Sequence, residues 1–199
     1  MATGAGFEAI VLAAGSGSRF GGGKLLAAWK SGVLLDGALA AAFAAPARGV
    51  TVVTGADADA VAAAAQAFDP RARIVHAAEH AEGMGASLRA GIASLPADTA
   101  AVFVFLGDMP CVPQAVLPAL AEALAKGAPA AAPVFNGRRG NPVLLGRELF
   151  PDLLALQGDE GARRLLQNLG DRLALIAAAD DGVLFDVDRQ SDLDKSGKW

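Results

Sequence analysis

A glycine-rich stretch near the start of the sequence combines residue types that suit phosphate binding. Residues 12–24 read Leu-Ala-Ala-Gly-Ser-Gly-Ser-Arg-Phe-Gly-Gly-Gly-Lys, with five glycines and two cations, Arg19 and Lys24. Glycines let backbone N–H groups turn toward a polyphosphate, and the two cations can neutralise its charge. The stretch fits neither the Walker pattern nor the shorter dinucleotide fingerprint. The sequence therefore predicts a phosphate cradle of another kind, with a flexible surface loop as the alternative.

Aspartates follow two apolar runs and could hold a divalent metal. Asp108 comes shortly after the run 100–106, and Asp186 and Asp188 alternate at the end of the run 183–187. Open sheets bind ligands at the carboxyl ends of their strands, and Mg²⁺ prefers one or two carboxylates plus phosphate oxygens. We expect Asp108 to be a metal ligand, although an aspartate here could instead cap the following helix. For Asp186 and Asp188, a solvated strand end is the alternative.

The remaining reactive side chains give weaker signals. Cys111 is the only cysteine of the sequence, which excludes an internal disulfide and a thiolate zinc cluster, and we expect it to be packed rather than nucleophilic. His76 and His80 have helical spacing and could share a metal, but no third ligand in a known pattern accompanies them. Solvated or capping histidines are the favoured interpretation.

The composition of the sequence limits the classes of protein to which it can belong. The 199 residues fit a single domain, and 53% hydrophobic residues, many of them Ala, provide a sizeable core of small side chains. A net charge of -4 argues against binding along a nucleic acid, which usually leaves a basic footprint. The N-terminus lacks the features of a signal peptide, and the Ala-rich runs are interrupted before they reach membrane-spanning length. We expect a cytoplasmic protein with no nucleic-acid or membrane partner.

Apolar strands alternate with helical segments through the first 127 residues. Strands are expected at residues 7–14, 50–54, 72–76 and 100–106, and helices at residues 34–45, 56–68, 85–95 and 113–126. This alternation is typical of a three-layer, Rossmann-like α/β fold, an open and mostly parallel sheet with helices on both faces. The glycine-rich stretch and Asp108 then fall at the carboxyl ends of two strands.

The pattern changes after residue 128. Two apolar segments, 130–135 and 142–145, flank a polar turn at 136–141 that suits a hairpin. The expected order is completed by helices at 147–156 and 160–169, strands at 172–178 and 183–187, and a short helical or frayed tail from residue 190. We interpret residues 1–199 as one domain made of two halves, at about 1–127 and about 128–199.

Several motifs together resemble the MobA-like nucleotidyltransferase superfamily, and within it the molybdenum cofactor cytidylyltransferases (MocA-like). They span nearly the whole sequence, at residues 12–24, 83–91, 106–110, 140–143, 158–163 and 186–193. Their order and spacing are more specific than any one motif. The resemblance implies a nucleotide-diphospho-sugar transferase fold. It also implies an Mg-dependent enzyme that transfers CMP from CTP to a phosphorylated, molybdopterin-type acceptor and releases pyrophosphate.

The same resemblance implies roles for residues around the triphosphate and the metal. The loop residues that would wrap the nucleotide are Leu12, Ala13, Ala14, Gly15, Ser16 and Gly17. Arg19 and Lys24 would contact phosphates as catalytic cations. Asp108 and Asp188 would bind Mg²⁺, since the second aspartate of the family's C-terminal D-x-D element is the metal ligand. This sequence has Arg189 and Gln190 where many relatives carry Thr-Pro.

The choice of base rests on a few small residues. Guanylyltransferases resemble Leu-Ala-Gly-Gly at the loop entrance and cytidylyltransferases resemble Leu-Ala-Ala-Gly, as here, so CTP is expected. The methyl group of Ala14 would close the pocket to a purine. Ser87 could hydrogen-bond the base, and Gly91, four residues on, would leave room beside it. The alternative for this pair is a close helix-to-sheet contact made by small residues.

The acceptor is expected to bind the second half of the chain, which we call the acceptor half (about 128–199), while the first half is the nucleotide half (about 1–127). Asn141 and Pro142 follow a basic turn, while Asp159 and Arg163 mark a helix start whose N–H groups could receive a pterin phosphate. Relatives usually carry His where Asn141 stands, and Asn can hydrogen-bond but cannot carry charge. A capped helix start and a solvated hairpin are the alternative.

Other functions stay open at this point. A guanylyltransferase of the molybdenum cofactor would differ chiefly at position 14, and a cytidylyltransferase of isoprenoid or sugar phosphates shares the fold and the metal chemistry. A non-catalytic nucleotide-binding or cofactor-delivery module would keep the fold without releasing pyrophosphate. If the product is a molybdenum cofactor, a downstream molybdoenzyme is a further expected partner.

Overall fold

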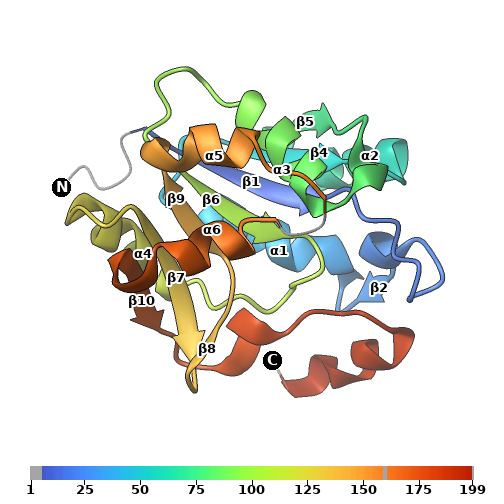
Figure 1. The fold of residues 1–199 in the computed structure, drawn as a ribbon. Helices are drawn as coiled ribbons and strands as arrows, with labels where there is room; N and C mark the ends of the chain where they lie inside the picture. Colours follow the sequence, from blue (N-terminus) through green and yellow to red (C-terminus); the bar gives the residue numbers. More distant parts are fainter. Residues whose placement is uncertain (1–5, 159–160, 199) are drawn as a thin grey trace.

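A single eight-stranded sheet organises the fold (Figure 1). The computed structural model describes residues 6–158 and 161–198. In order across the sheet the strands are β10 (Leu173–Ala177), β7 (Ala130–Phe135), β9 (Val143–Gly146), β6 (Ala101–Leu106), β1 (Phe7–Ala13), β4 (Val50–Thr54) and β5 (Arg73–His76). A short strand, β8 (Arg138–Arg139), pairs with β7 alone. The four strands from β6 to β5 are parallel, and β9 lies antiparallel between β6 and β7, which confirms a mostly parallel sheet.

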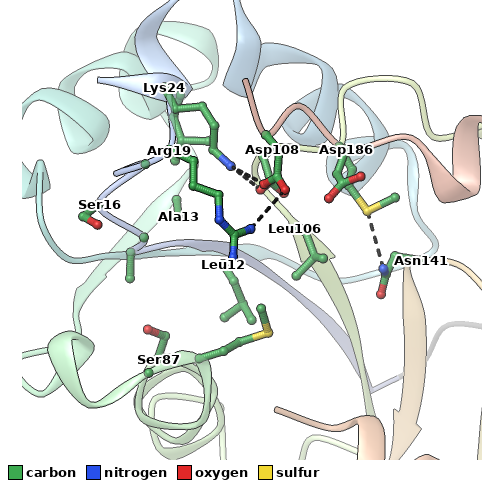
Figure 2. Close-up of a pocket in the computed structure, with 18 of the residues that line it drawn as sticks. Leu12, Ala13, Ser16, Arg19, Lys24, Ser87, Leu106, Asp108, Asn141 and Asp186 are labelled. Atoms are coloured by element: carbon green, nitrogen blue, oxygen red, sulfur yellow. Dashed lines mark hydrogen bonds and ion pairs between the residues drawn. The ribbon is translucent and has the colours of Figure 1, made fainter. Parts of the chain in front are cut away.

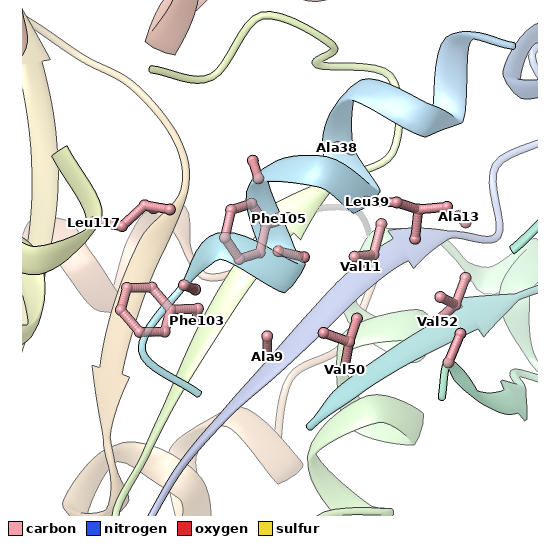
Figure 3. Close-up of a cluster of buried hydrophobic side chains, with 14 of the residues drawn as sticks. Ala9, Val11, Ala13, Ala38, Leu39, Val50, Val52, Phe103, Phe105 and Leu117 are labelled. Carbon is pink, nitrogen blue, oxygen red and sulfur yellow. The ribbon is translucent and has the colours of Figure 1, made fainter. Parts of the chain in front are cut away.

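Helices cover both faces of the sheet, as the alternating pattern predicted. One face carries α1 (Leu34–Ala44), α2 (Ala58–Phe68) and α4 (Val116–Ala125), and the other carries α3 (Met84–Ala93), α5 (Phe150–Leu154) and α6 (Arg163–Asn168). Each face of the sheet packs against its helices in a hydrophobic core. Side chains of β1 point to the two faces alternately, so Val11 lies in the first core, under α1, α2 and α4, and Ile10 lies in the second. Figure 3 shows the first core, in which α1 packs over Phe105 of β6.

The helices of the second half are shorter than expected. Residues 147–156 form a 3-10 turn, η3 (Arg147–Leu149), followed by the five residues of α5. Of residues 161–169, only those of α6 are in a helix, because Gly161 has a positive φ of 50°, a conformation that a right-handed helix does not contain. Among the described residues, no helix is both long and apolar enough to cross a bilayer.

The expected hairpin after residue 128 forms, with a tighter turn than the sequence suggested. Asn136 and Gly137 have positive φ values of 48° and 74°, as in a two-residue hairpin turn, and β8 returns directly along β7. The chain then leaves β7, and β9 inserts between β6 and β7. This excursion brings Asn141 beside Met109, just beyond the end of β6.

The strand expected at residues 183–187 does not form. Asp181–Leu184 make a 3-10 turn, η5, and residues 185–188 continue as an extended segment outside the sheet. The backbone of this segment bonds to loops: Asn141 donates its N–H to the carbonyl of Val183, and Val187 donates to the carbonyl of Asp108, at 2.9 and 3.0 Å. Because these groups are used by the loops, the segment crosses the strand ends instead of adding a strand.

A small third core, which we call the strap cluster, was not predicted. It includes a hairpin that the sequence did not reveal, made of β2 (Ala28–Trp29) and β3 (Gly32–Val33). Its buried members are Phe20, Trp29, Leu34 and Val187, with Ala27, Cys111, Phe185 and Leu193 partly buried around them. The rings of Trp29 and Phe185 lie 6.1 Å apart. The strap cluster therefore joins the extended segment 185–188 to the region that follows the glycine-rich loop.

Candidate active site

The carboxyl ends of β1 and β6 lie side by side and open into one cavity. The two strands pair in parallel with Leu12 opposite Leu106, and Gly107 donates its N–H to the carbonyl of Leu12. The cavity over these ends has a volume of about 830 Å³. It is lined by Leu12, Ala13, Ala14, Gly15, Ser16, Gly17, Arg19, Lys24, Leu25, His80, Ala81, Gly83, Met84, Ser87, Leu106, Asp108, Met109, Arg138, Arg139, Gly140, Asn141, Arg163, Val183, Leu184, Asp186 and Asp188. Residues far apart in the sequence thus meet at one edge of the sheet (Figure 2).

The glycine-rich loop folds back on itself. Gly17 has a φ of 59°, and a β-carbon there would lie 2.9 Å from the Cβ of Lys24, so glycine is needed at this close approach. The N–H groups of residues 20–22 all donate to the carbonyl of Gly17. These three amides bond within the loop, so the predicted cradle for a polyphosphate would have to use other N–H groups of the loop. The loop borders the cavity mainly through residues 13–17.

The two predicted cations pair with the two predicted aspartates at the cavity, and Figure 2 shows Lys24 pointing toward Asp108. Lys24 Nζ lies 2.6 Å from Asp108 Oδ2 and 4.0 Å from Asp188 Oδ1, and Arg19 Nη1 lies 3.2 Å from Asp188 Oδ2. The Lys24 side chain is 13% exposed, whereas that of Arg19 is 75% exposed. Asp108 does not cap the following helix, since α4 begins only at Val116. Carboxylates from two distant segments therefore converge on one cation.

Asp186 lies on the same side of its segment as Asp188. Phe185 and Val187 belong to the strap cluster, while the two aspartates line the cavity, so the predicted alternation holds although no strand forms. Burial, followed by the negative charges of Asp108 and Asp188, raises the pKa of the Asp186 carboxyl. The charged form of Asp186 is therefore disfavoured in this corner of the cavity.

The aspartates do not make a complete metal cage on their own. Within residues 6–158 and 161–198, no three carboxylate, histidine or cysteine side chains form a group that could hold a metal ion. Mg²⁺ typically takes one or two protein carboxylates and fills its remaining positions with phosphate oxygens and water. The arrangement suits a metal that binds together with a phosphate ligand.

Of the residues predicted to surround the base, Ala14 and Ser87 line the cavity and Gly91 does not. A β-carbon on Gly91 would lie 3.0 to 3.1 Å from side-chain atoms of Ile10 and Val53. Gly91 therefore faces the sheet and allows α3 to approach it closely. This corrects the expectation that Gly91 leaves room beside the base, and favours the packing alternative for that residue.

His80 lines the cavity, which the sequence did not indicate. Its ring Nδ1 lies 3.0 Å from the carbonyl oxygen of Ala77, and its ring centre is 6.1 Å from that of His76. The sequence signal that could have indicated His80 as a site residue is its position, three residues before the glycine that opens the motif at 83–91. Met84, Met109 and the arginines of the β7–β8 hairpin also line the cavity and were not singled out as site residues.

A second cavity of about 540 Å³ adjoins the first on the side of the acceptor half. Arg139, Asn141 and Arg163 line both cavities. Burial and the like charge of Arg163 lower the pKa of Arg139, and an anion between the two guanidinium groups would relieve this repulsion. Asn141 donates from Nδ2 to the sulfur of Met109 at 3.4 Å, which fixes its side chain at the junction of the cavities.

The two other predicted acceptor residues are placed differently. Pro142 is buried and lines neither cavity, so the expectation that it contacts the acceptor is corrected. Asp159 lies outside the described residues.

Cys111 is poorly suited to be a nucleophile. Burial raises the pKa of its thiol to about 11, so the reactive thiolate is scarce near neutral pH. The side chain belongs to the strap cluster. Packing is the role that the structure supports for this residue.

Comparisons with known proteins agree with this geometry. Residues 9–173 match the family described as MobA-like NTP transferase domain. A homologue of Mycobacterium tuberculosis Rv0371c from Mycobacterium sp. strain JC1 superposes with a TM-score of 0.84 at 25% identity, over 98% of each chain. A nucleotidyl transferase from Methanothermobacter has a TM-score of 0.81 at 26% identity, over 98% of this chain and 99% of that one. Rv0371c itself, solved in complex with manganese, has a TM-score of 0.79 at 25% identity, over 97% and 98%. No curated protein matches the chain.

Proposed function

Because the chain belongs to the MobA-like NTP transferase family, and is therefore a nucleotidyltransferase, we propose that it transfers CMP from CTP to a phosphorylated acceptor and releases pyrophosphate. We further propose that the metal is Mg²⁺ and that the acceptor is a molybdopterin-type pterin phosphate. The observation that carries the proposal is the convergence of Lys24, Asp108 and Asp188 beside the glycine-rich loop in one cavity.

Lys24 and Arg19 are proposed to bind the triphosphate. Both now pair with aspartates, so triphosphate binding would exchange one anionic partner for another. Their positive charges would stabilise the negative charge that develops on the pyrophosphate leaving group. Lys24 is the stronger candidate, since a cation that is largely shielded from water interacts more strongly with a phosphate.

Asp108 and Asp188 are proposed to hold the metal. When bound, Mg²⁺ would neutralise triphosphate charge and polarise the phosphoryl oxygens. The two carboxylates fit this role because both lie within 4.0 Å of one ammonium group and so already share a position for a cation. The manganese complex of Rv0371c supports a divalent metal.

The proposed reaction needs no covalent enzyme intermediate. An oxygen of the acceptor phosphate would form the new bond to the α phosphorus as the bond to the pyrophosphate oxygen breaks. An ionised phosphate is already a nucleophile, so no side chain has to remove a proton from it. The protein would accelerate the reaction mainly by holding the two phosphates in line and by stabilising the leaving group. The high pKa of Cys111 agrees with a mechanism that does not use the thiol.

Ala14 supports CTP as the nucleotide. Ala14 lines the cavity, as does the hydroxyl-bearing Ser87, and a glycine at position 14 would leave more room for a purine. We expect Ala14→Gly to relax the preference for CTP over GTP by a few fold to about a hundredfold, measured as the ratio of kcat/KM values. An unchanged ratio would place the size determinant elsewhere.

The second cavity supports an anionic acceptor with an apolar body. Arg139, Arg163 and Arg164 line this cavity together with apolar side chains such as Leu88, Val104 and Leu166. We expect Arg163→Ala to raise the KM for the acceptor while leaving CTP binding nearly unchanged, because only acceptor contacts are lost. A fall in CTP affinity with unchanged acceptor dependence would contradict this assignment.

A pyrophosphate-release screen tests the proposed function. The purified protein would be mixed with Mg²⁺, each of the four nucleoside triphosphates, and molybdopterin-type or sugar phosphate acceptors. Release with CTP and the pterin phosphate is the expected result. Release with GTP would indicate a guanylyltransferase, and release with a sugar phosphate would replace the proposed acceptor. No release in any mixture would favour a non-catalytic binding module.

A further inference from the structure

The residues proposed to select the base do not explain how the site would distinguish cytosine from uracil. Ala14 limits the size of the base, and the hydroxyl of Ser87 can either donate or accept a hydrogen bond. Neither property distinguishes cytosine from uracil, which are nearly equal in size. Besides an opposite polarity at N3, the bases differ at one exocyclic group: cytosine carries an amine, a donor, where uracil carries a carbonyl oxygen, an acceptor. Separating them requires a protein group whose hydrogen-bonding polarity is fixed.

A backbone contact fixes the hydrogen-bonding polarity of the His80 ring when the imidazole is neutral. Its Nδ1 lies 3.0 Å from the carbonyl oxygen of Ala77, and a carbonyl can only accept, so Nδ1 carries the hydrogen. In the neutral imidazole the other nitrogen, Nε2, is then an acceptor without a hydrogen. Because the backbone occupies the Nδ1 edge, Nε2 is the polar atom that the ring can offer to a ligand in the cavity.

His80 is also held in a defined position beside Ala14. A β-carbon on Gly55 would lie 2.7 Å from the Cβ of Ala14 and 2.8 Å from the Cγ of His80, so both side chains pack over this glycine. The backbone N–H of His80, at the start of η2 (His80–Glu82), donates to the same Ala77 carbonyl at 3.0 Å. Both Ala14 and His80 line the cavity. The acceptor on the ring is therefore fixed relative to the residue proposed to set the size of the base.

We propose that His80 selects CTP over UTP by accepting, at Nε2, a hydrogen bond from the exocyclic amine of cytosine. This inference rests on the proposed function, which puts the base of the nucleotide beside Ala14. With UTP, the carbonyl oxygen of uracil would face the lone pair of Nε2, leaving two acceptors desolvated and unpaired. His80 would thus reject UTP by polarity, whereas Ala14 rejects purines by size.

The test compares CTP and UTP in three variants, in mildly alkaline buffer where imidazole groups are generally neutral. His80→Phe keeps an aromatic ring over Gly55 and removes the acceptor. His80→Gln offers an amide that can turn either its oxygen or its NH₂ group toward a base. His76→Phe is the matched control, since His76 is the neighbouring histidine and does not line the cavity. Binding of each nucleotide is measured by calorimetry, and turnover by pyrophosphate release with the acceptor found in the screen.

The expected result is a fall of about 10- to 100-fold in the CTP to UTP ratio of kcat/KM for His80→Phe, with a parallel fall in the ratio of binding constants. His80→Gln should relax the ratio by raising UTP use, and His76→Phe should leave it unchanged. An unchanged ratio in both His80 variants, or an equal loss for both nucleotides, would overturn the inference while leaving a CTP-dependent enzyme intact. Wild-type protein that uses GTP instead of CTP would overturn the proposed function itself.

Discussion

The two ends of strand β1 hold the same kinds of charged side chains and use them differently. At the amino end, Glu8 is only 2% exposed and its carboxylate is bound by Arg48, at 3.0 Å, and by Arg73. Arg48 also pairs with Asp98 at 2.7 Å, and its hydrogen bond lowers the pKa of that carboxyl. Each carboxylate in this network has a guanidinium partner, so the charges stabilise one another.

At the carboxyl end, cations and carboxylates instead surround the large cavity. Lys24 pairs with Asp108 and lies near Asp188, while the pKa of Asp186 is raised by burial and by its acidic neighbours. The pKa shifts of Asp98 and Asp186 are opposite, because Asp98 has a guanidinium partner whereas Asp186 is buried beside two other carboxylates. Charges at the amino end should therefore govern stability, and charges at the carboxyl end should govern activity.

Removing the charge of Asp108 should give the largest effect. We expect Asp108→Asn to lower kcat by about 1,000-fold or more, because the proposed metal loses a ligand, while the protein still unfolds cooperatively. Pyrophosphate release and thermal unfolding followed by circular dichroism measure the two properties. The matched control is Asp98→Asn, at the other end of β1, which should keep full activity. Substantial activity in Asp108→Asn would remove the metal hypothesis.

The second-largest expected effect is a loss of activity when the largely buried cation Lys24 is removed. Lys24→Ala should lower kcat/KM by about 100-fold or more if the ammonium contacts the triphosphate. Lys126→Ala is a suitable comparison, since Lys126 pairs with Glu122 on the surface of α4 and should have little effect. A nearly normal rate in Lys24→Ala would return the glycine-rich stretch to the interpretation of a surface loop.

The amino end should show the reverse pattern. We expect Glu8→Gln to lower the free energy of unfolding by about 1.5–3 kcal/mol, the usual range for hydrogen bonds to a charged group, and to leave kcat unchanged in a cool assay. Chemical denaturation measures the loss, with Glu122→Gln as the surface control. A loss of activity without loss of stability would mean that the two ends are coupled.

The smallest expected effect is an increase in thermal stability. Because the pKa of Asp186 is higher in the folded protein than in the unfolded chain, ionising it opposes folding, and its contribution to stability falls as the pH rises through the folded pKa. Asp186→Asn should therefore raise Tm by about 1–3 °C at pH 7 in metal-free buffer, and the gain should disappear at acidic pH, where Asp186 is protonated in both states. A lower Tm in Asp186→Asn would show that the carboxylate is needed for packing.

Local sequence was enough to predict features that depend on one segment. The periodicity of residues 7–14 and 100–106 placed the strands, and with them the edge where the glycine-rich loop meets Asp108. Long-range contacts were not accessible. The segment 183–187 has the composition of a strand, yet its backbone bonds to loops, and the spacing of Gly91 gave no sign that it faces Ile10. His80 reaches the cavity only because Gly55 lies beneath its ring.

The strap cluster has a consequence for how the protein folds. It joins residues near position 30 to residues near position 187, so its formation closes a loop of more than 150 residues. Closing so long a loop is entropically costly, whereas the pairing of β1 with β4 and the packing of α1 need only local chain. During refolding we expect helical circular dichroism to recover before nucleotide binding does. For that interval, the chain would have much of its helical structure and no active site.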